Sequence, residues 1–207
     1  MKTVFVTGIH TDAGKTLASA ILCQALQLDY WKPIQSGADE DSDTLTVKDL
    51  LGETSTVFHP EAYRLQTPLS PHAAAKIDGV EIDLQNIKRP NSDRLLIEGA
   101  GGLLVPLNDK DVVADLIEPT DKVVLVSRHY LGSINHTMLS VAYLNQKGIV
   151  PGILFNGSEN SATEQAIANF GESIILGRID EAENVDTDFV FLQSEKFKSE
   201  LEKWLME

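Results

Sequence analysis

The chain has 207 residues with 31 acidic and 17 basic side chains, a formal charge of −14, which excludes nucleic-acid binding through bulk positive charge. With 43% hydrophobic and 23% charged residues, the composition is that of a folded globular protein and excludes global disorder. The single cysteine, Cys23, has no partner for a disulfide or a zinc site, as expected of a reduced, cytoplasmic protein. No apolar run approaches the roughly 20 residues of a membrane span, so no membrane partner is expected.

Short β-branched runs alternate with amphipathic runs, which is typical of βαβ units around a parallel sheet. We expect strands at Thr3–Thr7, Asp29–Pro33, Arg94–Glu98, Lys122–Ser127 and Gly152–Asn156, and one further strand each at Ser173–Leu176 and Asp188–Leu192. The expected helices are Lys15–Leu28, Asp43–Leu51, Pro71–Ile77, Val112–Ile117, Ser133–Lys147, Ala162–Phe170 and Glu195–Leu205. Because no repeat or linker interrupts them, residues 1–207 are predicted to form a single α/β domain with three layers, a mainly parallel central sheet flanked by helices.

A glycine-rich loop connects the first predicted strand to the first predicted helix. It is the run Gly8–Thr16 (GIHTDAGKT), and a strand before it and a helix after it are the context that a phosphate-binding loop requires. Its glycines let backbone N–H groups curl around phosphate oxygens, and the helix start adds a favourable dipole. Lys15 then neutralises β- and γ-phosphate charge, and the Thr16 hydroxyl is a ligand for Mg²⁺. The alternative is a glycine turn that joins strand and helix by coincidence.

Two acidic positions are candidates for binding Mg²⁺. Glu98 ends an apolar strand and precedes the glycine run Gly99–Gly102, at the edge of the sheet where the phosphate loop lies. For Glu98 the alternative is a solvated strand end. Asp43 belongs to the acid-rich loop Asp39–Asp43, where a helix cap on a solvated face is the alternative. Sequence position does not decide which of the four acids in this loop reaches a metal.

Six segments together resemble the dethiobiotin synthetase family: the phosphate loop, Trp31–Gly37, Ser42–Asp43, Ser70–His72, Glu98–Gly102 and Leu131–His136. Their combination and order are far more specific than any single motif. The resemblance implies a P-loop NTPase fold and an ATP- and Mg²⁺-dependent ligase that forms a cyclic urea on 7,8-diaminononanoate with CO₂, the penultimate step of biotin synthesis. One amine captures CO₂ as a carbamate, the carbamate attacks the γ-phosphate to give a carbamic–phosphoric mixed anhydride, and the second amine closes the ring and releases phosphate.

The same resemblance implies the roles of the site residues. Lys15 acts at the γ-phosphate and Lys32 on the carbamate oxygen, which offsets the repulsion between two anions. Thr11 and Ser36 position the carbamate and its amine. Mg²⁺ is held by Thr16, Asp43 and Glu98. The implied nucleotide contacts are Asp12, Ala13, Gly14, Lys15, Thr16, Leu17, Asp43, Glu98, Gly99, Ala100, Gly101, Asn156 and Gly157. Without the family, Lys32 is interpreted as an exposed lysine after a strand.

The predicted helix start at Ser133 is a candidate carboxylate site, because free amides at a helix start bind anions. The resemblance implies that Ser133, Ile134 and Asn135 come from the second subunit of a homodimer and bind the carboxylate tail of the diamine, so the substrate site lies at the subunit interface. Ser133 is also expected to be the N-cap of this helix.

The adenine base is expected to pair with the amide side chain of Asn156, which ends a strand. A plain turn residue is the alternative. Asp180 stands where the family commonly has proline, which argues against base contacts from Asp180–Ala182. Asp12 stands where the family often has glutamate, so its reach is shorter.

Three other classes of protein share parts of this pattern. A P-loop switch ATPase of the same superfamily hydrolyses ATP without the diamine, but the partition-type members carry an early loop lysine where this chain has His10. A cobyrinate amidating enzyme needs a glutaminase domain, for which 207 residues leave no room. A nucleoside or nucleotide kinase usually needs an arginine-rich lid, and the five arginines here are not clustered.

Overall fold

The computed structural model describes residues 2–37 and 42–206. Its main sheet has seven strands in the order β4-β2-β6-β1-β7-β8-β9, and the paired strands are parallel throughout. These strands are β1 (Lys2–Gly8), β2 (Asp29–Trp31), β4 (Phe58–His59), β6 (Arg94–Gly102), β7 (Lys122–Arg128), β8 (Gly152–Asn156) and β9 (Ile174–Ile179). A second, two-stranded parallel sheet pairs β3 (Ile34–Ser36) with β5 (Tyr63–Leu65).

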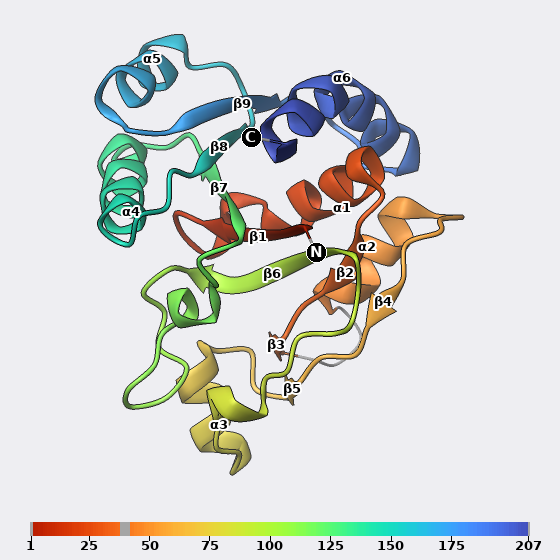
Figure 1. Ribbon diagram of the computed structural model, residues 1–207, viewed down its shortest axis with the longest axis vertical. Coiled ribbons are helices and arrows are strands. Elements are labelled where there is room, and N and C mark those ends of the chain that lie inside the picture. Colours follow the sequence, from red (N-terminus) through yellow and green to blue (C-terminus); the bar gives the residue numbers. More distant parts are fainter. Residues whose placement is uncertain (1, 38–41, 207) are drawn as a thin grey trace.

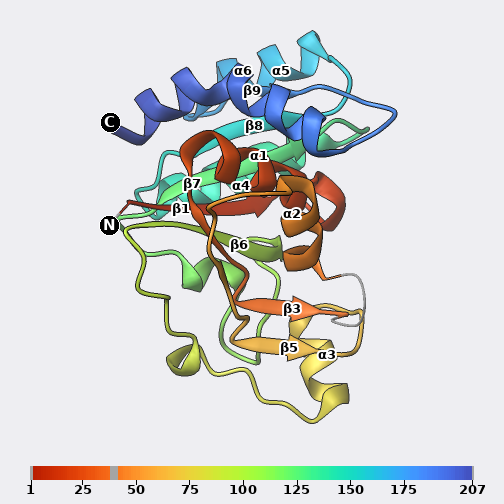
Figure 2. The ribbon, with the colours of Figure 1, turned by 90° about the vertical axis from the view of Figure 1, so that its right-hand side faces the viewer.

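Helices cover both faces of the main sheet (Figure 1). On one face lie α1 (Lys15–Leu26), α2 (Asp43–Leu51) and α6 (Thr187–Met206), which pack against one another; on the other lie α4 (Ser133–Gln146) and α5 (Ser161–Phe170). The small sheet and α3 (Pro71–Asp78) lie together beyond β6 (Figure 2). This arrangement confirms the predicted three-layer α/β fold. Within residues 2–37 and 42–206, no helix has the length and hydropathy that a membrane span requires.

Strand β1 separates the two main cores. Val4 and Val6 belong to a core that includes the fully buried Cys23 of α1, whereas Phe5 belongs to the core on the opposite face with Ile97 of β6. Consecutive strand residues point to opposite faces. A strand that is buried on both faces therefore reads as a continuous apolar run, which is how the sequence shows β1.

The segment Asp188–Leu192, expected as a strand, lies in the first turns of α6, so that prediction is wrong. The Asp186 carboxylate accepts a hydrogen bond from the Phe189 amide (2.9 Å) and stabilises the helix start. Val190 and Phe197 are both buried and lie two helical turns apart. The helical period of the apolar residues appears only over the whole helix, because five residues are too few to tell a helical from a strand pattern.

Other boundaries also differ from the sequence-based expectations. The expected helix Val112–Ile117 is a short 3-10 turn, Val113–Leu116. Strand β6 does not end at Glu98 but continues to Gly102, where it pairs with Gly8 of β1. Strands β3, β4 and β5 were not predicted, because two or three residues carry no readable period.

Candidate active site

A cleft of about 630 Å³ opens at the carboxyl ends of β1, β2 and β6. The site residues predicted from the sequence that line it are Thr11, Asp12, Gly14, Lys15, Thr16, Lys32, Ser36, Asp43, Glu98, Ala100 and Gly101. Lining residues that were not predicted are Ile34, Gln35, Val105 and residues 68–71. The carboxyl edge of a parallel sheet is where open α/β folds bind ligands, and here it brings together side chains more than 80 residues apart, as between Thr16 and Glu98.

Lys32 lies between two carboxylates at the base of this cleft. Its Nζ is 2.5 Å from Oδ2 of Asp43 and 3.0 Å from Oε1 of Glu98. Burial lowers the pKa of Lys32, but the charges of Glu98 and Asp43 outweigh burial and raise it overall. The side chains of Lys32 and Glu98 are 4% and 0% exposed, so the alternatives of an exposed lysine and a solvated strand end are wrong.

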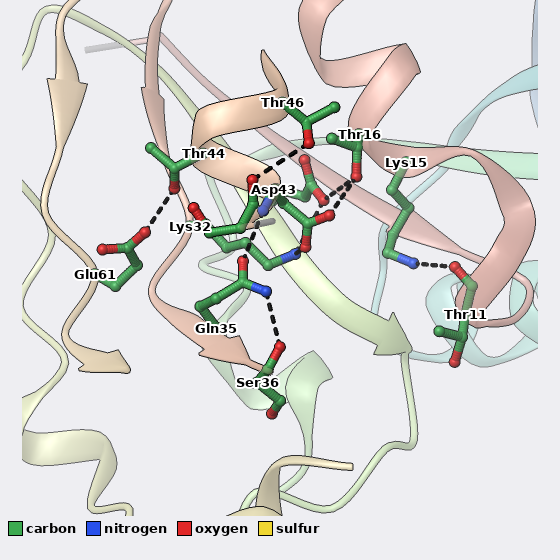
Figure 3. Close-up of polar contacts among 12 residues, drawn as sticks. Thr11, Lys15, Thr16, Lys32, Gln35, Ser36, Asp43, Thr44, Thr46 and Glu61 are labelled. Atoms are coloured by element: carbon green, nitrogen blue, oxygen red, sulfur yellow. Dashed lines mark hydrogen bonds and ion pairs between the residues drawn. The ribbon is translucent and has the colours of Figure 1, made fainter. Parts of the chain in front are cut away.

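Thr16 joins this cluster from the start of α1 (Figure 3). Its hydroxyl donates to Oδ1 of Asp43 at 2.8 Å and lies 3.2 Å from Oε1 of Glu98. Burial raises the pKa of Asp43, but Lys32 and the Thr16 hydroxyl outweigh burial and lower it overall. The cluster of Thr16, Lys32, Asp43 and Glu98 is hereafter called the charge cluster.

Two further residues, which the sequence did not indicate, contact Glu98 and Asp43, one at the carboxylate and the other at the backbone amide. The Tyr30 hydroxyl donates to Oε2 of Glu98 at 3.0 Å, and Oε1 of Gln35 accepts from the Asp43 amide at 3.1 Å. Tyr30 reads as a core residue of a buried strand, and nothing in its sequence context distinguishes it. Gln35 lies inside the segment Trp31–Gly37, and that position was the available signal.

The cap of α2 is Ser42 rather than Asp43. The Ser42 hydroxyl accepts a hydrogen bond from the Leu45 amide (3.3 Å), which leaves the Asp43 carboxylate for the charge cluster. Of the acid-rich loop Asp39–Asp43, the other acids lie outside the described residues. Asp43 is therefore the acid of this loop that the structure brings to Lys32.

The lysine of the phosphate loop is hydrogen-bonded to the backbone of the loop itself. The Lys15 ammonium donates to the Thr11 carbonyl at 2.9 Å (Figure 3). Burial lowers the pKa of Lys15, and the neighbouring Lys32 charge lowers it further. The Asp12 amide donates to Nδ1 of His10 (3.1 Å), so His10 helps to shape the loop at the position where partition-type ATPases have a lysine.

The residues expected at the base lie behind the phosphate loop and outside the cleft lining. Nδ2 of Asn156 donates to the Ala13 carbonyl at 2.9 Å. The Asp180 carboxylate contacts Lys196 of α6 at 2.8 Å and accepts from Nε2 of Gln193 at 3.0 Å, and these bonds lower its pKa. Asp180, which departs from the family pattern, therefore links the end of β9 to α6 through these contacts.

The start of α4 lies apart from the cleft within the same chain. Gly132, with φ of +105°, is the N-cap, so the expectation that Ser133 caps this helix is wrong. The Ser133 amide donates to the Tyr130 carbonyl (3.0 Å), and its side chain is buried. Ile134 and Asn135 line a separate hollow of about 840 Å³. Within one chain, the structure does not bring these residues to the charge cluster.

The oxygen atoms of Thr16, Asp43 and Glu98 converge as Mg²⁺ requires of its ligands. Among the described residues, no group of three or more His, Cys, Asp or Glu side chains could hold a metal. Two carboxylates and a hydroxyl fit an ion that takes its remaining ligands from phosphate and water, which is the usual mode of Mg²⁺.

Known structures share the fold at low sequence identity. The MinC:MinD cell division protein complex of Aquifex aeolicus matches with a TM-score of 0.59 at 13% identity, over 100% of this chain and 97% of that one. A plasmid partition protein of Borrelia burgdorferi bound to AMPPNP matches with a TM-score of 0.58 at 11% identity, over 99% and 97%. These likenesses establish the P-loop fold alone.

Sequence relatives are much closer. A family model described as an AAA domain matches residues 2–188. The ATP-dependent dethiobiotin synthetase BioD of Christiangramia forsetii is 52% identical over 202 residues, which cover 97% of this chain and 98% of the relative. The chain belongs to the dethiobiotin synthetase family. The ATP-dependent dethiobiotin synthetase BioD of Cytophaga hutchinsonii is 50% identical over 92% of this chain and 94% of its own length. The sequence similarity therefore spans nearly the whole chain.

Replacing Lys32 by methionine is expected to destabilise the fold. Lys32→Met leaves Glu98 and Asp43 without their buried counter-charge, and breaking such a pair costs about 3 kcal/mol of unfolding free energy. Lys76→Met, at an exposed position of α3, is the matched control and is expected to change the free energy by less than about 0.5 kcal/mol. Urea unfolding at neutral pH measures both. Equal stability of the two variants would contradict a paired charge at Lys32.

Proposed function

We propose that the chain catalyses the ATP-dependent formation of dethiobiotin, as a ligase that closes a cyclic urea on 7,8-diaminononanoate with CO₂. The main support is Lys32, a second buried ammonium group beside the phosphate loop. The chain is also 52% identical to a relative named for this reaction. A switch ATPase needs the loop lysine and a metal site but has no use for Lys32. The family relationship also disfavours the switch ATPase.

Two lysines supply the positive charge that brings the two anionic reactants together. Lys15 exchanges the Thr11 carbonyl for the γ-phosphate, and Lys32 binds the carbamate oxygen that attacks phosphorus. Both reactants are anions, and two preorganised, buried ammonium groups reduce their repulsion. The hydroxyl groups of Thr11 and Ser36, which line the same cleft, hold the carbamate and its amine.

The carboxylates of the charge cluster have a second task, to hold Mg²⁺ together with the Thr16 hydroxyl. Bound Mg²⁺ neutralises charge on the β- and γ-phosphate oxygens. The backbone of residues 12–17 and 98–101 surrounds the phosphates, and the Asn156 amide with Gly157 meets the adenine base. The convergence of three oxygen ligands at the loop supports this assignment.

A second copy of the chain completes the site. Ser133, Ile134 and Asn135 lie away from the cleft of their own chain, and the start of α4 offers amides to a carboxylate tail. The helix start also exposes the apolar side chains of Leu131 and Ile134, as an interface does. We infer a cytoplasmic homodimer in which each chain, as one domain, supplies the helix start for its partner.

The reaction is tested by phosphate release from Mg·ATP with bicarbonate, with and without 7,8-diaminononanoate, and by mass spectrometry of the product. Release that requires the diamine and yields the cyclic urea is expected. Release indifferent to the diamine would instead identify a switch ATPase.

The role of Lys32 is tested by measuring kcat and the Kd for ATP separately in a Lys32 variant. Lys32→Ala is expected to lower kcat by about 100-fold or more, because its proposed contact is with the carbamate and not with the nucleotide. The Kd for ATP, measured by calorimetry, is expected to stay within about threefold. A comparable loss of ATP affinity would reassign Lys32 to the nucleotide.

The shared site is tested by mixing two inactive variants. Lys15→Ala removes the phosphate contact, and Ile134→Pro removes an amide at the helix start while leaving Lys15 intact. If each site uses both chains, refolding the two together restores about a quarter of wild-type activity, through heterodimers with one intact site. Ile134→Ala, which keeps the amide, is the control and retains activity by itself. Failure of the mixture to recover would place both functions in one chain.

A further inference from the structure

Asn156 joins the end of β8 to the phosphate loop, 143 residues earlier in the chain. Its Nδ2 donates to the carbonyl oxygen of Ala13 at 2.9 Å. Ala13 is fully buried and ends the 3-10 turn Thr11–Ala13, and Gly14 links this turn to α1. The hydrogen bond therefore holds the peptide unit at the passage from loop to helix.

Gly14 lies directly beneath the Asn156 amide. A Cβ atom on Gly14 would be 2.1 Å from Nδ2 of Asn156, which no side chain could tolerate. Gly14 also has φ of +93°, a left-handed conformation that favours glycine. The loop and the Asn156 side chain therefore fit each other closely at this point, and the fit depends on an amide of this size.

The direction of the bond matters for anion binding. A peptide unit is planar and trans, so the carbonyl of Ala13 and the N–H of Gly14 point in opposite directions. A donor that holds the carbonyl on the Asn156 side turns the Gly14 N–H the other way, and Gly14 lines the cleft. Loss of that donor removes the hydrogen bond that opposes rotation of the carbonyl toward the phosphates, which it would repel.

We propose that Asn156 is a positioning residue for the phosphate loop, which keeps the Ala13–Gly14 peptide oriented for phosphate binding whatever base the nucleotide carries. This role goes beyond a contact with adenine and does not depend on it. The Oδ1 atom of Asn156 takes no part in the bond to Ala13 and is left for the base. Reading the base and holding the loop are then two tasks of one side chain.

Hydrogen–deuterium exchange of the ligand-free protein tests the proposal. Asn156→Asp keeps the size of the side chain but replaces the donor by a charged acceptor that faces the Ala13 carbonyl. Amide exchange in the peptide covering residues 9–17 is expected to be about tenfold faster than in the wild type, the factor that corresponds to one lost hydrogen bond. Asn156→Ala adds no charge and is expected to have the same effect, so the test stands if the Asp variant folds poorly.

Asn160→Asp is the matched control. The Asn160 side chain accepts a hydrogen bond from the Thr163 amide (3.1 Å) as the cap of α5, and a carboxylate accepts that bond equally well. Its loop exchange is expected to match the wild type. Unchanged exchange in both Asn156 variants would overturn the proposal, since a residue that only contacts the base has no effect in the ligand-free protein.

Binding of ATP and of inorganic tripolyphosphate, each with Mg²⁺, separates the two roles. If Asn156 holds the loop, Asn156→Ala weakens tripolyphosphate binding by about tenfold and ATP binding by at least that factor, since ATP also loses the contact with its base. Weaker ATP binding with unchanged tripolyphosphate binding would show that Asn156 acts on the base alone and would overturn the proposal. Neither result bears on whether the diamine is the substrate, so the proposed function is tested separately.

Discussion

The Lys32 ammonium, enclosed by the carboxylates of Asp43 and Glu98, is the interaction on which the site depends. A buried charge is tolerated only where an opposite charge and hydrogen bonds meet it. The four members of the charge cluster come from the start of α1, the end of β2, the start of α2 and the middle of β6. Charge balance at one point therefore fixes how these elements lie relative to one another, and the cleft takes its shape from them.

This local balance contrasts with the charge of the whole chain. With a formal charge of −14, the protein repels anions at long range, yet its cleft is lined by two ammonium groups, Lys15 of the phosphate loop and Lys32 directly after β2. Screening by salt limits the long-range repulsion to about 10 Å, whereas contacts inside a buried site are screened much less. In the proposed reaction, binding of the phosphates depends on Lys15 and the loop amides and binding of the carbamate depends on Lys32, and not on net charge.

Long apolar strands and amphipathic helices could be predicted from the sequence because their periods repeat several times. β1, β7 and β8 were found in this way, together with most of the helix starts. The failures have a common cause. The first residues of α6 resemble a strand when taken alone, and β3 to β5 exist only because they pair with neighbours, so local pattern carries too little information.

The sequence by itself determined the phosphate loop and the acid Glu98 that follows an apolar run, because these are local motifs of defined chemistry, and the resemblance to the family implied the roles of Lys32 and Asp43. Only the tertiary structure decided that Asp43 contacts Lys32 while Ser42 caps α2, that Tyr30 supports Glu98, and that Asn156 holds Ala13. The contact between Tyr30 and Glu98 joins the neighbouring strands β2 and β6, and the other two join loop residues to a helix start and to the end of β8 at the carboxyl edge of the sheet. Their partners depend on strand order and register, which no local pattern encodes.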